Sequence, residues 1–537
     1  MRMEWKGKPM ADTGTKNGNG GNVAEAPPEP ESKRFSFPSA LTVLALVLLL
    51  VWLAAFFIPS GTYELDEEGS PIPGSYQEIS SCDDAAEGTA CVDKGPLDMF
   101  RILWVGTPNG LYGVEDSVGT VQSSNEGFLY GSAEIFLFVL AVGAFITVTM
   151  KTGAIELGIK RLALRYRSSP TSLIVILMLV FALGGTTYGM WEETLGFYTL
   201  MVVLVLAMGL DRMVGATIIF IGAGTGVLAS TVNPFATGVA SDAAGVAISD
   251  GLALRAVMWV VLVAMGIAYV LWYARRVEKD PARSIVGFDA DPETGEIGDV
   301  PKMTTRQVWV LVVFAFSFLT MIYGFIPWED IWQNVFGSAY PLPELWELFG
   351  DFYFTETSMI FIVAAVVIGI IGGLGEKGTV NAMVAGAADF LGAALVIVVA
   401  RGITVVMKNT YITDSILNWM EDAVAGTSSV GFSLLAFLVN IPIAFLVPSS
   451  SGHAALVMPI LAPLADFAEV DRSIAVTAFQ SASGWVNLVT PTSAVLMGGL
   501  ALAKIGYNKY LKFVGAYLGI LFVAIALFLI VATLVTG

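Results

Sequence analysis

Runs of about 20 apolar residues recur along the chain, separated by short polar or charged segments. A helical run of this length crosses the roughly 30 Å hydrocarbon core of a bilayer. The pattern therefore predicts an all-α polytopic membrane protein. Uninterrupted spans are expected at 37–58, 133–150, 252–274, 307–327, 357–374, 388–407 and 513–535.

Four further apolar segments are interrupted by stretches rich in Gly, Pro, Ser and Thr. Segment 171–210 is flanked by Arg167 and Arg212, which should both be cytoplasmic, so it is predicted to be a re-entrant hairpin. Segment 430–466 enters and leaves from the opposite side. The last two are spans broken at 230–238 and 487–493. We expect nine spans, two opposed hairpins and two discontinuous helices, with amphipathic stretches at 151–167 and 411–424.

Basic residues at the span ends set the predicted orientation in a cell (plasma) membrane. Lys33 and Arg34 keep the N-terminus in the cytoplasm, and the count of spans leaves the C-terminus extracytoplasmic. The polar N-terminal residues contain no apolar signal core and are expected to be a disordered tail. The predicted organisation is a tail at 1–36, a first half at 37–277 with an acidic extracytoplasmic loop at 59–131, a cytoplasmic linker at 278–305 and a second half at 306–537.

The two halves contain a repeat. Residues 146–155 match residues 403–412 at six of ten positions, and the same offset places Val232-Asn233-Pro234 on Val489-Thr490-Pro491. The two copies should run in opposite directions through the membrane. A duplicated hydrophobic unit with polar, proline-broken centres is typical of an inverted-repeat secondary transporter.

Charge is concentrated outside the apolar runs. The formal net charge is −18, and the segment from residue 60 to 130 contains 13 acidic residues against Lys94 and Arg101. Such a surface argues against nucleic acid as a partner and would suit a halophilic source. The two cysteines, Cys82 and Cys91, lie in this segment and could form a structural disulfide if it faces an oxidising exterior.

Backbone that leaves the helix inside a membrane is tolerated where protein or a polar cavity satisfies its N–H and C=O groups. The hairpin tips and helix breaks therefore predict one site between the repeats. Freed carbonyls and neutral side-chain oxygens suit Na⁺, with Thr231, Asn233, Thr490 and Thr492 as its candidate ligands. The candidate substrate-binding residues are Thr186, Thr187, Glu192, Glu193, Thr194, Asn233, Thr237, Arg401, Ser449, Ser450, Ser451, His453, Asn487, Thr490, Thr492 and Ser493.

Several of these residues have a structural alternative. Glu192 and Glu193 could be solvated at the cytoplasmic mouth, although carboxylates inside a membrane are by default functional. Arg401, within an apolar run, could bind a substrate carboxylate or pair with an acidic side chain of the protein. His453 is the only histidine, and a structural hydrogen bond is its favoured role over proton transfer.

Four segments resemble one family in order: 184–194, 230–238, 400–403 and 448–453. They are similar to the YfcC-type carriers of the anaerobic C4-dicarboxylate carrier (DcuC-like) family, within the ion transporter superfamily. The resemblance implies a homodimer in the lipid bilayer, in which a transport domain carrying the hairpins moves by an elevator motion against a scaffold domain. Members are labelled as carriers of dicarboxylates or of basic amino acids.

Other functional classes fit the sequence less well. A channel needs a continuous polar path, whereas polar residues here gather at mid-membrane between apolar runs. A metalloenzyme needs a ligand cluster, which one histidine and two loop cysteines do not supply. Residues 375–379 lack the spacing of a phosphate-binding loop, so transport is expected to be driven by an ion gradient or by exchange and not by ATP. Neither an enzyme nor a cofactor is expected, and Na⁺ or H⁺ is the candidate coupling ion.

The predicted solute is a small charged organic molecule. A dicarboxylate site should exclude negative charge, because like charges repel strongly in a poorly hydrated cavity. The pair Glu192 and Glu193 together with Arg401 instead suits both ends of an amino acid. We therefore favour an amino acid, of the basic arginine or ornithine type in exchange, and keep a C4-dicarboxylate as the alternative.

Overall fold

The computed structural model describes residues 40–65, 71–82, 90–166, 168–288, 300–326, 328–336, 352–447 and 449–536, all within one unit that spans residues 38–537. The predicted tail 1–36 lies outside the described residues. In the first half of the chain the helices are α1 Ala40–Ala54, α2 Pro96–Tyr112, α3 Ala133–Lys151, α4 Ala154–Arg165, α5 Pro170–Tyr188, η1 Glu192–Phe197, α6 Tyr198–Ala207, α7 Arg212–Leu228, η2 Pro234–Gly238, α8 Val239–Ala244, α9 Leu252–Lys279 and η3 Pro281–Arg283.

The second half continues with α10 Thr305–Gly324, α11 Trp328–Phe336, α13 Phe354–Gly372, α14 Gly375–Asn409, α15 Ile412–Ala425, α16 Ser429–Leu446, α17 Ser450–Phe467, α18 Arg472–Asn487, α19 Ala494–Leu502 and α20 Tyr507–Thr536. Eight helices of the described residues are long and apolar enough to cross a membrane, namely α3, α5, α9, α10, α13, α14, α16 and α20. Length and composition thus confirm an all-α polytopic membrane protein.

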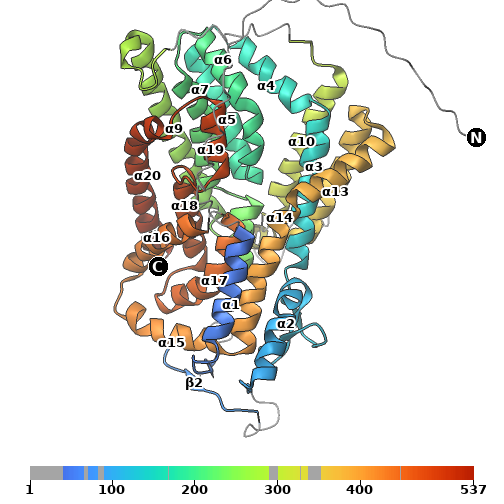
Figure 1. The fold of residues 1–537 in the computed structure, drawn as a ribbon, viewed down its shortest axis with the longest axis vertical. Helices are drawn as coiled ribbons and strands as arrows, with labels where there is room; N and C mark the ends of the chain where they lie inside the picture. Colours follow the sequence, from blue (N-terminus) through green and yellow to red (C-terminus); the bar gives the residue numbers. More distant parts are fainter. Residues whose placement is uncertain are drawn as a thin grey trace, which may run out of the picture. The chain divides into compact units, whose positions relative to one another are not determined.

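The duplicated stretches lie on α3 and α14, and these two helices pack against each other along with α13 (Figure 1). Two glycines allow their backbones to approach closely. A Cβ atom on Gly143 would lie 2.6 Å from the carbonyl oxygen of Gly386, and one on Gly386 would lie 2.3 Å from that of Gly143. Larger side chains at either position would force the repeats apart.

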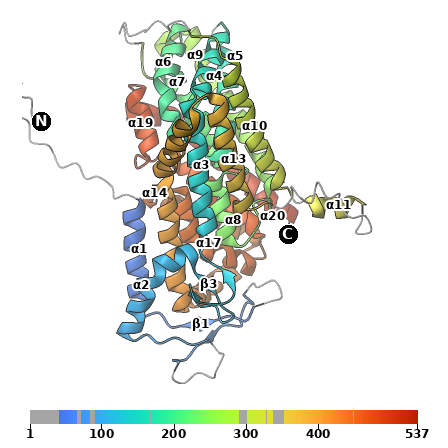
Figure 2. The same cartoon turned by 90° about the vertical axis from the view of Figure 1, so that its right-hand side faces the viewer.

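The acidic segment 59–131 is more structured than the predicted loop. It contains α2 and a small antiparallel sheet of β3 Val114–Glu115, β4 Val121–Gln122 and β5 Phe128–Leu129, while β1 Gly61–Thr62 pairs with β2 Gln77–Glu78 (Figure 2). Helix α2 packs on α14 where Gly110 meets Gly402. Cys82 and Cys91, for which a disulfide was one possibility, form that disulfide, with their Cα atoms 4.8 Å apart.

Each re-entrant hairpin packs on the discontinuous helix that follows it. Helices α5 and α6 both contact α7, which continues after a break as η2 and α8, and helices α16 and α17 both contact α18, which continues as α19. The same order of hairpin and broken helix in both halves agrees with the sequence repeat.

The first hairpin is predicted to break within 184–189, and α5 ends inside that stretch: the helix continues to Tyr188, and Gly189 then adopts a left-handed φ of 74°. The earlier glycine Gly185 serves packing, because a Cβ atom there would lie 2.4 Å from the carbonyl oxygen of Ala223 in α7. One predicted boundary was wrong. Helix α14 begins at Gly375 and not at 388, since the intervening residues contain no proline and the glycine at 373 already turns the chain.

Donors from other helices hold the two breaks. Arg255 is fully buried and donates to the carbonyl of Thr231 at the first break at 3.4 Å. It also donates to the carbonyls of Ile248 and Asp250, in the turn before α9, at 2.5 and 2.7 Å. The carbonyl of Ser230 accepts from Nε2 of Gln480 at 3.0 Å. At the second break, the hydroxyls of Tyr510 and Tyr507 donate to the carbonyls of Leu488 and Val489 at 2.8 and 2.5 Å. These carbonyls therefore have protein donors and are less free for Na⁺ than predicted.

A buried carboxylate joins the start of α7 to the far end of α9. Asp211 is inaccessible to solvent and caps α7, accepting from the backbone N–H of Val214 at 3.0 Å. Its other oxygen accepts from the hydroxyls of Tyr273 and Ser284, both at 2.6 Å. The side chain of Asp211 thus joins the N-terminus of α7, the C-terminal part of α9 and the start of the linker in one hydrogen-bond network.

We expect Asp211→Ala to lower the melting temperature of the purified protein in detergent. The change leaves two hydroxyls without their acceptor, at about 1–3 kcal/mol each, and removes a helix cap worth about 1 kcal/mol. Asp211→Asn keeps the cap and should lose less, and Asp280→Ala, at an exposed pair with Arg283, is the control. A melting temperature equal to that of the unmodified chain would contradict this role.

Candidate functional site

A cavity of about 700 Å³ lies where the hairpin tips, the helix breaks and the two repeat helices meet. The first hairpin supplies Glu192 and Glu193, and the second supplies Ser449, Ser450 and Ser451. Helices α3 and α14 close the opposite wall through Thr147 and Asp389, among others. Residues from all four interruptions therefore line one cavity. Its lining includes nine of the predicted substrate residues: Glu192, Glu193, Asn233, Ser449, Ser450, Ser451, Asn487, Thr492 and Ser493.

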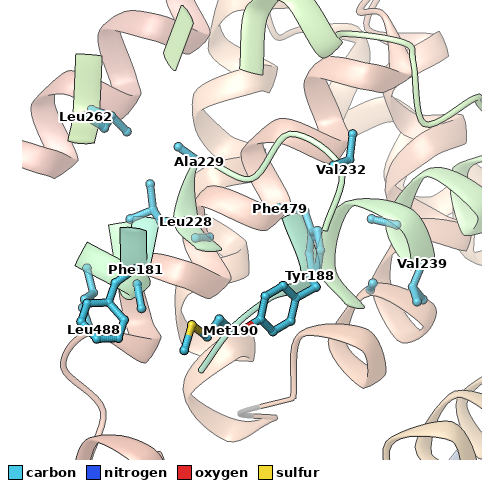
Figure 3. Packing of buried hydrophobic residues seen from close by; sticks show 14 of the residues in the cluster. Phe181, Tyr188, Met190, Leu228, Ala229, Val232, Val239, Leu262, Phe479 and Leu488 are labelled. Carbon is cyan, nitrogen blue, oxygen red and sulfur yellow. The ribbon is translucent and has the colours of Figure 1, made fainter. Parts of the chain in front are cut away.

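The first hairpin tip is fixed against the first break. Gly189 lies so close to Asn233 that a Cβ atom would be 2.8 Å from its Oδ1. Asn233 in turn caps the short π-helix η2 by accepting from the N–H of Phe235 at 2.9 Å. Tyr188 and Met190 of the tip belong to the same apolar cluster as Val232 beside the break (Figure 3). The side chains of Glu192 and Glu193, which follow this tip, therefore extend from a well-packed segment.

The second tip is the N-terminus of a helix. Ser449 caps α17 by accepting from the N–H of Gly452 at 3.3 Å, and the hydroxyl of Ser450 lies 3.2 Å from that of Ser483 on α18. Ser493 caps α19 in the same way, accepting from the N–H of Leu496 at 3.3 Å. Helix N-termini carry partial positive charge, so these two ends favour the carboxylate of a bound solute.

The charged groups of the cavity are all acidic. Glu192, Glu193 and Asp389 line it, whereas its lining among the described residues contains no Lys, Arg or His. Glu193 accepts from the N–H of Trp191 at 3.3 Å, and Glu192 and Asp389 are exposed. Asp389 was missed in the sequence, although a lone carboxylate in the apolar stretch before the repeat is a detectable signal.

The other predicted residues lie outside the cavity lining. Thr186 binds Thr231 hydroxyl to hydroxyl at 3.0 Å, and Thr237 donates to Oε1 of Gln480 at 2.7 Å. They join the hairpin and the break to their neighbours. Three other threonines form local hydrogen bonds: Thr187 to the carbonyl of Leu183 at 2.7 Å, Thr194 to that of Trp191 at 2.5 Å, and Thr490 to the hydroxyl of Thr492 at 2.6 Å.

Arg401 belongs to a different site. Its guanidinium pairs with Asp242 of α8 at 3.0 Å, donates to the carbonyl of Tyr130 at 3.2 Å and lies over that ring at 4.7 Å. It lines a second pocket of about 630 Å³. Of the two predicted roles, pairing with an acidic side chain of the protein is confirmed, and Arg401 does not face the cavity with Glu192 and Glu193. Its partner Asp242 was not predicted.

His453 is an apolar packing residue in this structure. It is fully buried, and neither ring nitrogen has a hydrogen-bond partner among the described residues. Its ring meets Phe479 edge-on at 4.7 Å. The favoured structural hydrogen bond is therefore absent from the described part of the chain, and His453 lies outside the cavity lining.

Comparison with known proteins identifies relatives along almost the whole chain. The family described as the C4-dicarboxylate anaerobic carrier (DcuC) matches residues 37–534. An uncharacterized protein of Haemophilus influenzae is 29% identical over 525 residues, which cover 93% of this chain and 98% of that protein. The "Putative basic amino acid antiporter YfcC" of Escherichia coli is 28% identical over 505 residues, which cover 92% and 95%.

Two solved membrane transporters share the fold. The YdaH transporter of Alcanivorax borkumensis superimposes with a TM-score of 0.66 at 15% identity, covering 92% of this chain and 98% of that one. MtrF of Neisseria gonorrhoeae, described as illuminating a class of antimetabolite efflux pumps, gives 0.64 at 16% identity, covering 93% and 96%. The resemblance seen in the four sequence segments is confirmed: the chain belongs to the C4-dicarboxylate anaerobic carrier family of membrane transporters.

Proposed function

We propose that the chain is a secondary transporter of a basic amino acid, of the arginine or ornithine type, working by exchange or ion coupling. The cavity's three carboxylates, with no basic residue among its described lining, are the observation that supports this most directly. A dicarboxylate would bring two more negative charges into a space that already holds three carboxylates, and like charges repel one another. The YfcC relative's name points the same way.

The geometry offers a place for each end of such a solute. The α-carboxylate fits the N-termini of α17 and α19, where Ser449 and Ser493 add hydroxyl groups. The α-ammonium and the side-chain cation fit Glu192, Glu193 and Asp389, which come from the first hairpin and from α14. Because Arg401 lies outside the cavity lining, the proposal assigns the carboxylate of the solute to the helix N-termini.

Movement is proposed to follow the elevator scheme implied by the family resemblance, in a homodimer in the plasma membrane. The hairpins and broken helices would move together past α3 and α14. The pair of Asp242 and Arg401 joins α8 to α14 and would have to break in that motion. The hydroxyl of Tyr353, which donates to the other oxygen of Asp242 at 2.8 Å, would separate with it.

Neutralising the cavity carboxylates should impair exchange of a basic amino acid. In liposomes we expect Glu193→Gln and Asp389→Asn each to lower the catalytic efficiency of arginine counterflow by about tenfold, which corresponds to about 1.4 kcal/mol for the loss of one carboxylate partner of the bound cation. Glu156→Gln, at the exposed pair with Lys160 on α4, is the matched control and should be unchanged.

The same assay separates the alternative substrate class. Unlabelled arginine and ornithine should compete, and succinate should not. Strong competition by succinate, with both cavity variants unimpaired, would contradict the basic amino acid and favour a C4-dicarboxylate. Saturable exchange of neither class, with channel-like conductance, would contradict transport by a carrier.

The proposed coupling ion is Na⁺ or H⁺. Side-chain oxygens at Asn233, Thr231, Thr490 and Thr492 are the candidate Na⁺ ligands, and the cavity carboxylates are the candidate proton acceptors. We expect Asn233→Ala and Thr490→Ala to raise the Na⁺ concentration that gives half-maximal uptake. Thr320→Ala, where the hydroxyl binds only its own helix at Phe316, is the control. Uptake that does not change when Na⁺ is removed at fixed pH would leave H⁺ as the proposed ion.

A further inference from the structure

An apolar groove of about 740 Å³ runs between α9 and α20. Its walls include Val261 and Met265 on α9 and Val523 and Leu527 on α20. Gly519 forms part of its floor, and a Cβ atom there would meet no described atom within 4 Å. The groove therefore has room for an additional apolar group beside Gly519.

A basic pocket of about 800 Å³ lies at the end of the same helix. Arg275, Arg276, Lys279 and Arg283 line it, and all four side chains are exposed. The one acidic residue in its described lining, Asp280, pairs with Arg283 at 3.0 Å. Three cationic side chains remain beyond that pair.

One stripe of α9 connects the two spaces. Val261, Met265, Ala268, Trp272 and Lys279 follow one another at intervals of three, four or seven residues, which places them on one face of the helix. Val261 to Trp272 covers about 16 Å along the axis, close to the roughly 15 Å of one bilayer leaflet.

Trp272 stands where the apolar part ends. It is 54% exposed, and the guanidinium of Arg276 lies 5.6 Å from its ring centre. Tryptophan at such a border is typical of the membrane–water interface, and the basic end is the one predicted to be cytoplasmic. The stripe thus has the polarity profile of one phospholipid: an apolar chain, an interface and an anionic headgroup.

We propose that α9 and α20 bind one anionic phospholipid, with its phosphate held by Arg275, Arg276 and Lys279 and an acyl chain in the groove. Guanidinium groups bind phosphate oxygens in bidentate geometry, and clusters of basic residues at the cytoplasmic end of a membrane helix suit anionic lipid headgroups. A zwitterionic lipid carries the same phosphate, but its headgroup cation would be repelled by the three basic side chains and would leave their net charge unreduced. The competing occupant is the acidic stretch 289–299 of the chain itself, which lies outside the described residues.

The test is lipid binding to the purified full-length chain, measured by native mass spectrometry with phosphatidylglycerol and phosphatidylcholine of the same acyl composition. We expect phosphatidylglycerol to be retained preferentially. The triple change Arg275→Gln, Arg276→Gln, Lys279→Gln should weaken its binding by about fivefold per charge and leave phosphatidylcholine unaffected. A control triple change on α4, Lys160→Gln, Arg161→Gln, Arg165→Gln, removes the same charge elsewhere and should not matter.

A second variant tests the acyl chain. Gly519→Leu places an apolar side chain in the groove, at a position where a Cβ atom would meet no described atom within 4 Å, and should also weaken phosphatidylglycerol binding although every basic residue remains. Glycerol 3-phosphate that binds as tightly as the lipid would indicate a phosphate site and overturn the proposal. Equal retention of both lipids, equal losses in the two triple variants, or phosphatidylglycerol binding only after the acidic residues of 289–299 are neutralised would overturn it too.

Discussion

The site depends on how backbone groups are satisfied where two membrane helices are broken. A carbonyl that loses its helical partner in an apolar interior costs several kcal/mol unless another donor reaches it. Arg255 and Gln480 supply those donors at the first break, and Tyr507 and Tyr510 supply them at the second. Each donor comes from a helix other than the broken segment it stabilises. The breaks are therefore fixed features of the packing, and the residues beside them can keep a constant geometry around a bound solute.

This constraint explains why the cavity has two different walls. The breaks and hairpin tips share donors and caps, so Glu193, Asn233 and Ser450 are presented by one set of tightly joined elements. The facing helices α3 and α14 meet each other at glycines, Gly143 and Gly386, and contribute few polar groups to the cavity. In the proposed elevator motion, the hydrogen-bonded wall would slide past the helical wall without breaking the site itself. The contacts of Asp242 on α8 with Arg401 on α14 and with Tyr353 beside α13 would have to break.

Local sequence patterns were enough to predict the helices, hairpins and breaks. The roles of individual side chains depended on contacts between residues far apart in the sequence. Clusters of Gly, Pro and Ser marked the hairpins and breaks correctly, because leaving a membrane helix requires such residues nearby in sequence. The role of Arg401 depended on Asp242, 159 residues away, and the donor to Ser230 is 250 residues away at Gln480. No local periodicity encodes such pairs. Within the predicted break at 184–189 the sequence did not tell which glycine ends the helix. Gly189 ends it and Gly185 admits α7, yet the two kinds of glycine look the same in one sequence.

The acidity of the cavity links substrate choice to coupling. In the proposed motion Glu192 and Glu193 travel with the first hairpin, while Asp389 stays on α14. Two carboxylates carried across a medium of low dielectric without partners would meet a large electrostatic barrier, whereas the same groups paired with cations would not. The proposed cationic amino acid would compensate part of that charge, and the proposed Na⁺ or protons would compensate the rest. The loaded site should therefore move more readily than the empty one, which is the physical requirement for exchange. Because Leu488, Val489 and Ser230 direct their carbonyls at protein donors, the compensation falls chiefly to the side chains, with Asp389 as the carboxylate that the facing helix contributes.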